Sequence, residues 1–126
     1  MTYEFTAERA PTWLHVTGRG EHTAENLRRL LLDAYRSAIE QHCDTLLIEL
    51  NFTGPSLSVG TIYTVIAERS GDGAQLRHIV WVDNDPGHHE GAEFAEAAAR
   101  KLGISVQFFP TLAEARRSLQ GAARRA

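Results

Sequence analysis

The pattern of apolar and polar residues changes its period several times along the chain. Residues 3–8 alternate between apolar and polar side chains, which is the period of a strand with one buried face. From Thr23, a good N-cap, apolar side chains recur every three or four positions, which predicts an amphipathic helix. Residues 45–52 are almost continuously apolar, which is typical of a strand buried on both faces in a parallel sheet.

The same reading divides the whole chain into short strands and helices. The predicted strands cover residues 3–8, 12–17, 45–52, 76–82 and 104–109. The predicted helices cover residues 23–39, 58–69, 90–102 and 111–119. Gly18 and Gly20 are expected to end the second strand. This order predicts a single α/β domain over residues 1–119, with a mainly parallel sheet, an N-terminal antiparallel hairpin and a frayed basic tail at 120–126.

Three segments together resemble a known family. A strand at 46–51 runs through a short loop into the helix at 58–69, and the chain closes on Phe-Pro-Thr-Leu-Ala-Glu-Ala at 109–115. With the element order, this resembles the STAS family of sulfate transporters and anti-sigma-factor antagonists, and within it the SpoIIAA-like bacterial proteins. Signalling members carry an aspartate and a phosphorylatable serine in this loop. Here Ser58 takes the serine's place, preceded by Leu57, so the resemblance implies a regulatory binding module with Ser58 as a candidate phosphoacceptor.

Composition narrows the function classes further. Thirteen basic and sixteen acidic residues among 126 leave a charge of -3, so we expect no nucleic-acid partner. No segment approaches the roughly 20 apolar residues of a membrane span, and residues 1–10 do not resemble a signal peptide. We therefore expect no membrane insertion and a cytoplasmic location. The single cysteine, Cys43, excludes an internal disulfide.

Two loops are the candidate binding site, because ligands of open parallel sheets bind beyond the carboxyl ends of the strands. The first loop covers residues 51–58 and the second covers residues 83–93. Their candidate ligand- or partner-binding residues are Asn51, Ser56, Ser58, Asp83 and Asp85. The second loop lies in a segment, residues 83–96, that contains five acidic residues and no lysine or arginine. Any ion-dependent behaviour is expected there.

Two other kinds of chemistry use the same loops. His88, His89 and Glu93 carry the imidazole and carboxylate groups of a metal site, although their spacing matches no known motif. Ser58, His88 or His89, and Asp83 provide the groups of a hydrolase triad, but the Gly-x-Ser-x-Gly elbow is missing. Other histidines, including His22, are expected to be structural.

The sequence thus favours a non-enzymatic STAS-like module that binds a protein or small ligand through these loops. It assigns no catalytic residue and no cofactor. The alternatives are a metal-dependent or hydrolytic enzyme and a carrier of an apolar molecule, which would need a cavity of a few hundred Å³. A homodimer is a further hypothesis, because so short a chain leaves part of the sheet thinly covered.

Overall fold

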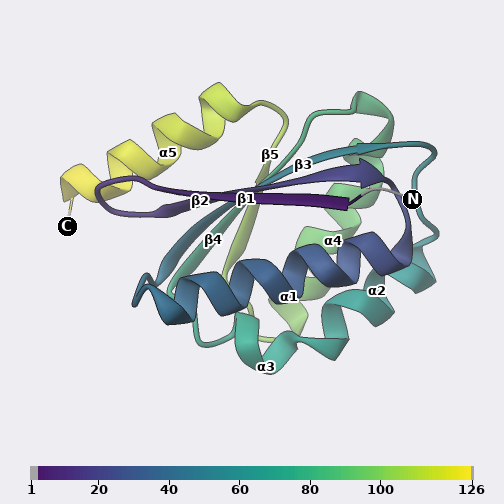
Figure 1. The fold of residues 1–126 in the computed structure, drawn as a ribbon, viewed down its shortest axis with the longest axis horizontal. Helices are drawn as coiled ribbons and strands as arrows, with labels where there is room; N and C mark the ends of the chain where they lie inside the picture. Colours follow the sequence, from purple (N-terminus) through teal and green to yellow (C-terminus); the bar gives the residue numbers. More distant parts are fainter. Residues whose placement is uncertain (1–2, 126) are drawn as a thin grey trace.

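One five-stranded sheet organises the molecule (Figure 1). The computed structural model describes residues 3–125, and side chains up to residue 121. The strands follow one another in chain order across the sheet: β1 Tyr3–Arg9, β2 Leu14–Glu21, β3 Thr45–Thr53, β4 His78–Asp83 and β5 Val106–Phe109. β1 and β2 are antiparallel and all other neighbours are parallel. The predicted α/β fold with an N-terminal hairpin is therefore confirmed.

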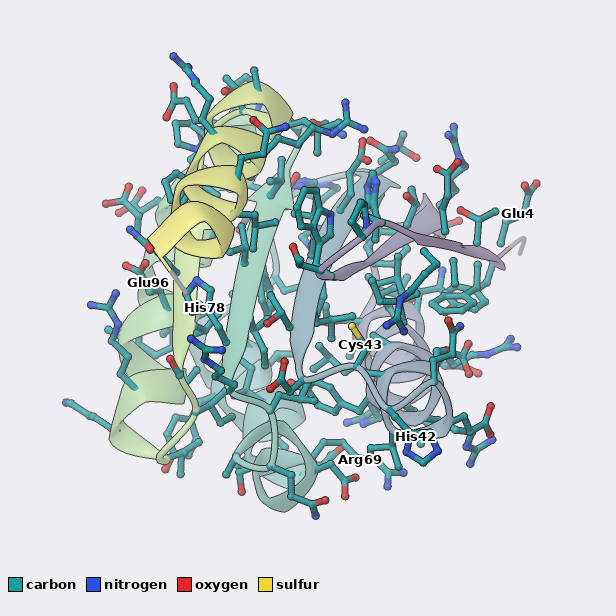
Figure 2. The ribbon with its side chains drawn as sticks, turned by 90° about the vertical axis from the view of Figure 1, so that its left-hand side faces the viewer. Glu4, His42, Cys43, Arg69, His78 and Glu96 are labelled. Atoms are coloured by element: carbon teal, nitrogen blue, oxygen red, sulfur yellow. The ribbon has the colours of Figure 1, made fainter. Side chains whose placement is uncertain are left out.

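The helices form two unequal layers on the sheet. They are α1 Ala24–Glu40, α2 Val59–Glu68, α3 Ser70–Gly73, α4 His89–Lys101 and α5 Leu112–Arg125, with a 3-10 turn, η1, at Pro86–His88. α1, α2 and α4 pack on one face, whereas α5 alone packs on the other (Figures 1 and 2). None of the helices in the described part of the chain is long and apolar enough to cross a membrane.

The continuous apolar run of β3 is explained by these two layers. Leu46, Ile48 and Leu50 enter the larger core under α1, α2 and α4, whereas Leu47 enters the smaller core under α5. Successive side chains of a strand point to opposite faces, so both sets must be apolar. Trp81 of β4 belongs to the larger core and is 7% exposed.

Capping side chains mark the starts of three helices, and the sequence indicates the first of them, Thr23. The side chain of Thr23 accepts a hydrogen bond from the backbone N–H of Asn26, and Ser58 accepts one from Thr61. Thr111 does the same for Glu114 at the start of α5. Each bond satisfies a backbone donor that has no partner inside its helix.

β2 is longer than predicted, because its glycines do not end it. β2 continues to Glu21, and Gly18 lies directly under α1. A Cβ at Gly18 would lie 2.8 Å from Cδ2 of Leu30, so this glycine allows close packing of a helix on a continuing strand. The last helix is also longer than predicted, since α5 runs to Arg125.

The smaller layer leaves part of one sheet face polar. α5 lies over β4 and β5, while β1 and β2 extend to its side (Figure 2). On this open part, Glu49 of β3 accepts hydrogen bonds from His15 at 2.8 Å and from Asn84 at 2.7 Å. Cys43 lies inside on the opposite side of the sheet, where it is buried and its thiol contacts the carbonyl of Thr45.

Candidate functional site

The two candidate loops meet at the carboxyl ends of β3 and β4. The contact is made by His88 of η1, whose Nε2 lies 2.6 Å from the carbonyl oxygen of Gly54. Gly54 has a φ of +123°, a conformation that glycine adopts without strain, and this turns the loop after β3 towards β4. The two loops therefore form one continuous surface.

His88 is held by an acidic partner as well as by this carbonyl. Its Nδ1 lies 3.0 and 3.1 Å from the two carboxylate oxygens of Asp83, and both residues are buried. Burial opposes a charge on the ring, but the Gly54 carbonyl and the carboxylates of Asp83 and Asp85 outweigh it and raise the pKa of His88. Both ring nitrogens face acceptors, so the protonated imidazolium satisfies every contact.

His22 lies on top of this pair, which the sequence did not indicate. It follows β2 directly, and its backbone N–H donates to the carbonyl of Thr53 at 2.8 Å. Its ring centroid is 4.0 Å from that of His88, and its Nδ1 lies 3.0 Å from the carbonyl oxygen of Pro55. Burial, and then the charge on His88, lower the pKa of His22. We call His22, Asp83 and His88 the histidine cluster.

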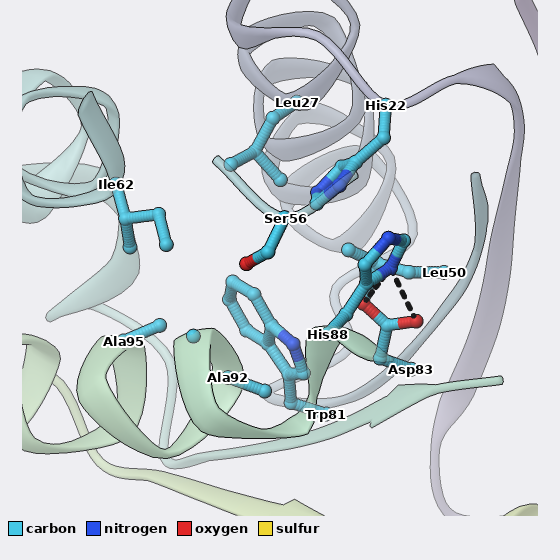
Figure 3. Close-up of a pocket in the computed structure, with 11 residues that line it drawn as sticks. His22, Leu27, Leu50, Ser56, Ile62, Trp81, Asp83, His88, Ala92 and Ala95 are labelled. Carbon is cyan, nitrogen blue, oxygen red and sulfur yellow. Dashed lines mark hydrogen bonds and ion pairs between the residues drawn. The ribbon is translucent and has the colours of Figure 1, made fainter. Parts of the chain in front are cut away.

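A small cavity lies beneath the histidine cluster (Figure 3). Its volume is about 20 Å³, which is room for about one water molecule. The hydroxyl of Ser56 and the indole of Trp81 line it together with apolar side chains of α1, α2 and α4. Among the described side chains, the Nε1 of Trp81 is buried without a hydrogen-bond partner. A cavity of this size does not favour an apolar carrier.

An open groove lies on the outer side of the same loops. It has a volume of about 400 Å³ and is lined by Asn51, Phe52, Thr53, Asn84, Asp85 and Pro86, which we call the ligand groove. The amide nitrogen of Asn84 donates to Glu49 and to Asn51, which fixes both asparagines across the ends of β3 and β4. The Asp85 side chain is 43% exposed.

The expected binding residues are divided between the ligand groove and the cavity, and one of them lies in neither. Asn51 and Asp85 line the ligand groove, whereas Ser56 and Asp83 line the cavity. Ser58 is an exposed helix cap: it accepts from the N–H of Thr61 and donates to the Thr61 hydroxyl at 2.9 Å. Because its hydroxyl bonds within α2, the geometry does not favour a triad with His88 and Asp83.

The three residues expected as metal ligands point in different directions. His88 points into the histidine cluster. The ring of His89 turns away to place its edge against Phe108, and its Nε2 donates to the backbone carbonyl of Asp83 at 3.0 Å. Glu93 is exposed on α4. The structure therefore brings His88 together with His22 and Asp83, and not with His89 and Glu93.

The comparisons with known proteins identify no family for this chain. No protein-family model matches the chain, and no curated protein matches it. The chemistry of the site must therefore be argued from its geometry.

Proposed function

We propose that this protein is a non-enzymatic STAS-like binding module that takes a small polar ligand in the ligand groove. The observation that carries the proposal is the position and size of this groove. It lies beyond the carboxyl ends of two parallel neighbours, β3 and β4, where open α/β sheets bind their ligands. Its volume of about 400 Å³ is within the usual range for small-molecule sites.

The polarity of the groove supports a ligand that donates hydrogen bonds. Glu49 accepts from the amide nitrogens of Asn51 and Asn84. A carboxylate only accepts hydrogen bonds, so both amide NH₂ groups face inward and the Asn84 carbonyl oxygen is left for the ligand. The exposed carboxylate of Asp85 adds a negative charge. An amine, with its positive charge and several N–H donors, suits this set of groups.

The side chains that could transfer a proton or attack a substrate already form hydrogen bonds within the protein, which supports binding over catalysis. Both nitrogens of His88 have internal partners, in Asp83 and the Gly54 carbonyl. The hydroxyl of Ser58 is used by α2. A general base or nucleophile must reach the substrate, and these groups are directed into the protein instead. Ser58 is exposed at a helix N-terminus, where a phosphate would be stabilised, and so it stays a candidate phosphoacceptor within this proposal.

Two probes of opposite charge and equal length test the proposal. We expect 1,4-diaminobutane, added to ¹⁵N-labelled protein, to shift the backbone amides of Asn51, Thr53, Asn84 and Asp85 in a saturable way. Succinate should leave these amides unchanged, and Asp85→Asn should weaken the diamine response. Glu93→Gln, which removes an exposed charge from α4, is the matched control and should respond like the wild type. Equal responses to both probes, or no response at the groove, would contradict the proposal.

A further inference from the structure

We propose that the histidine cluster is a binding site for one divalent transition-metal ion of the zinc type. His22, Asp83 and His88 each offer one ligand atom, and these atoms all lie within 4.8 Å of one another. The three side chains come from the ends of β2 and β4 and from η1 (Figure 3). This inference does not rest on the ligand groove, whose lining residues are different.

The hydrogen bonds behind the two rings are those of metal-binding histidines. Nδ1 of His22 faces the carbonyl oxygen of Pro55, and Nε2 of His88 faces that of Gly54. A carbonyl only accepts, so each of these nitrogens carries a proton. The lone pair available for a metal is then on Nε2 of His22 and, once its proton leaves, on Nδ1 of His88. Histidine ligands of metals almost always donate their second N–H in this way.

The spacing of Asp83 and His88 fits two ligands of one ion. Nδ1 of His88 lies 3.0 Å from Oδ2 of Asp83. Two ligands at about 2.0–2.1 Å from a tetrahedral zinc ion lie about 3.3 Å apart. An ion bonded to both atoms would lie off the line that joins them, so the His88 ring would turn from its hydrogen-bonded position to aim its lone pair at the ion. His22 is only half-buried, so its ring can turn to close the remaining distance.

The cavity beneath the histidine cluster provides the remaining coordination position. It has room for about one water molecule, with a volume of about 20 Å³, and it is lined by all three ligand residues. Trp81, whose buried indole N–H has no hydrogen-bond partner among the described residues, also lines this cavity. Buried donors of this kind normally have an acceptor. A water or hydroxide on the ion would accept this hydrogen bond, and it would also lie near the hydroxyl of Ser56.

The donor set determines which ion fits. Two imidazoles and one carboxylate suit zinc and its neighbours in the first transition series, whereas calcium and magnesium prefer oxygen ligands. The negative charge of the surrounding segment favours the binding of a cation, because residues 83–96 contain five acidic side chains and no lysine or arginine. Asp85, whose Oδ2 lies 3.4 Å from Nε2 of His88, adds negative charge beside the ion.

Calorimetric titration of the untagged, EDTA-treated protein with Zn²⁺ tests this site. We expect one ion per chain, no comparable binding of Mg²⁺, and a Co²⁺ complex with the visible absorption of a nitrogen- and oxygen-ligated ion. His22→Ala should weaken Zn²⁺ binding by about 10- to 100-fold or more. His22→Gln, which keeps a donor for the Pro55 carbonyl, should weaken it as well.

A matched histidine at the other end of the sheet provides the control. His78 starts β4 and is half-buried like His22, but it lies at the opposite end of the strand from Asp83. His78→Ala should bind Zn²⁺ as the wild type does, and circular dichroism should show that each variant is folded. Failure of the wild type to bind one ion, or equal binding by wild type and folded His22→Ala, would overturn the proposal. A metal result of either sign leaves the diamine test of the ligand groove unaffected.

Discussion

Nδ1 of His88 lies 3.0 Å from Oδ2 of Asp83, and the two side chains are only 2% and 4% exposed. This buried ion pair joins the loop after β4 to the end of β4 itself, and through the Gly54 carbonyl it also holds the loop after β3. At this depth, bulk water does not solvate a partner that is left alone. The pair therefore matters more for keeping the loops together than an exposed pair of the same length would.

His88→Ala should destabilise the fold strongly. The change leaves the carboxylate of Asp83 buried without its cationic partner, which typically costs about 3–5 kcal/mol. Urea unfolding at pH 7 in the presence of EDTA measures this loss without a contribution from bound metal. The double variant Asp83→Asn/His88→Gln removes both charges together and should be more stable than His88→Ala. A loss below about 1 kcal/mol for His88→Ala would show that the pair is dispensable.

Gly18→Ala tests the close packing of α1 on β2. The added Cβ would lie 2.8 and 2.9 Å from the two methyl carbons of Leu30. The side chain of Leu30 is fully buried in the core. Overpacking of this kind typically costs about 1–3 kcal/mol. Combining Gly18→Ala with Leu30→Ala should cost less than the two single changes together, because the smaller side chain makes room. Thermal or urea unfolding of the four proteins checks this, and strict additivity would contradict the contact.

The sequence was sufficient for the order of the elements but not for the composition of the site. Periodicity and caps such as Thr23 identify strands and helices, because they report local backbone geometry. His22 was missed because β2 was expected to end at residue 17. In the structure Gly20 pairs with Phe52 and Glu21 with Thr53, so the next residue, His22, lies beside the loop after β3. The parallel pairing of two distant strands determines this position.

The two adjacent histidines show a second limit of sequence analysis. A 3-10 turn ends at His88 and α4 begins at His89, so the two rings point in different directions. One ring enters the histidine cluster and the other packs against Phe108. The segment itself was identified as a candidate site from its His and acidic residues. Which histidine faces Asp83 depends on the path of one short turn.

Ser58→Ala should lower stability moderately. The Ser58 side chain accepts a hydrogen bond from the Thr61 N–H at the start of α2, and loss of such a cap costs about 1 kcal/mol. Ser58→Asp keeps an acceptor at the cap and adds a negative charge at the positive end of the helix, so it should be near the wild type. Urea unfolding compares the three proteins. Equal destabilisation by alanine and aspartate would contradict a capping role.

Glu49 should make the stability of the protein depend on pH in the acid range. Its hydrogen bond with His15, supported by those from Asn84 and Asn51, outweighs burial and lowers the pKa of Glu49 to about 2. The lowered pKa means that the ionised carboxylate stabilises the fold above the unfolded value of about 4.3, and that this stabilisation disappears as the pH falls towards 2. The free energy of unfolding should therefore fall more steeply between about pH 4.3 and pH 2 for the wild type than for Glu49→Gln. Because other carboxylates titrate in both proteins, the difference between the two curves isolates Glu49. Parallel curves would mean that the contact of Glu49 with His15 contributes nothing to stability.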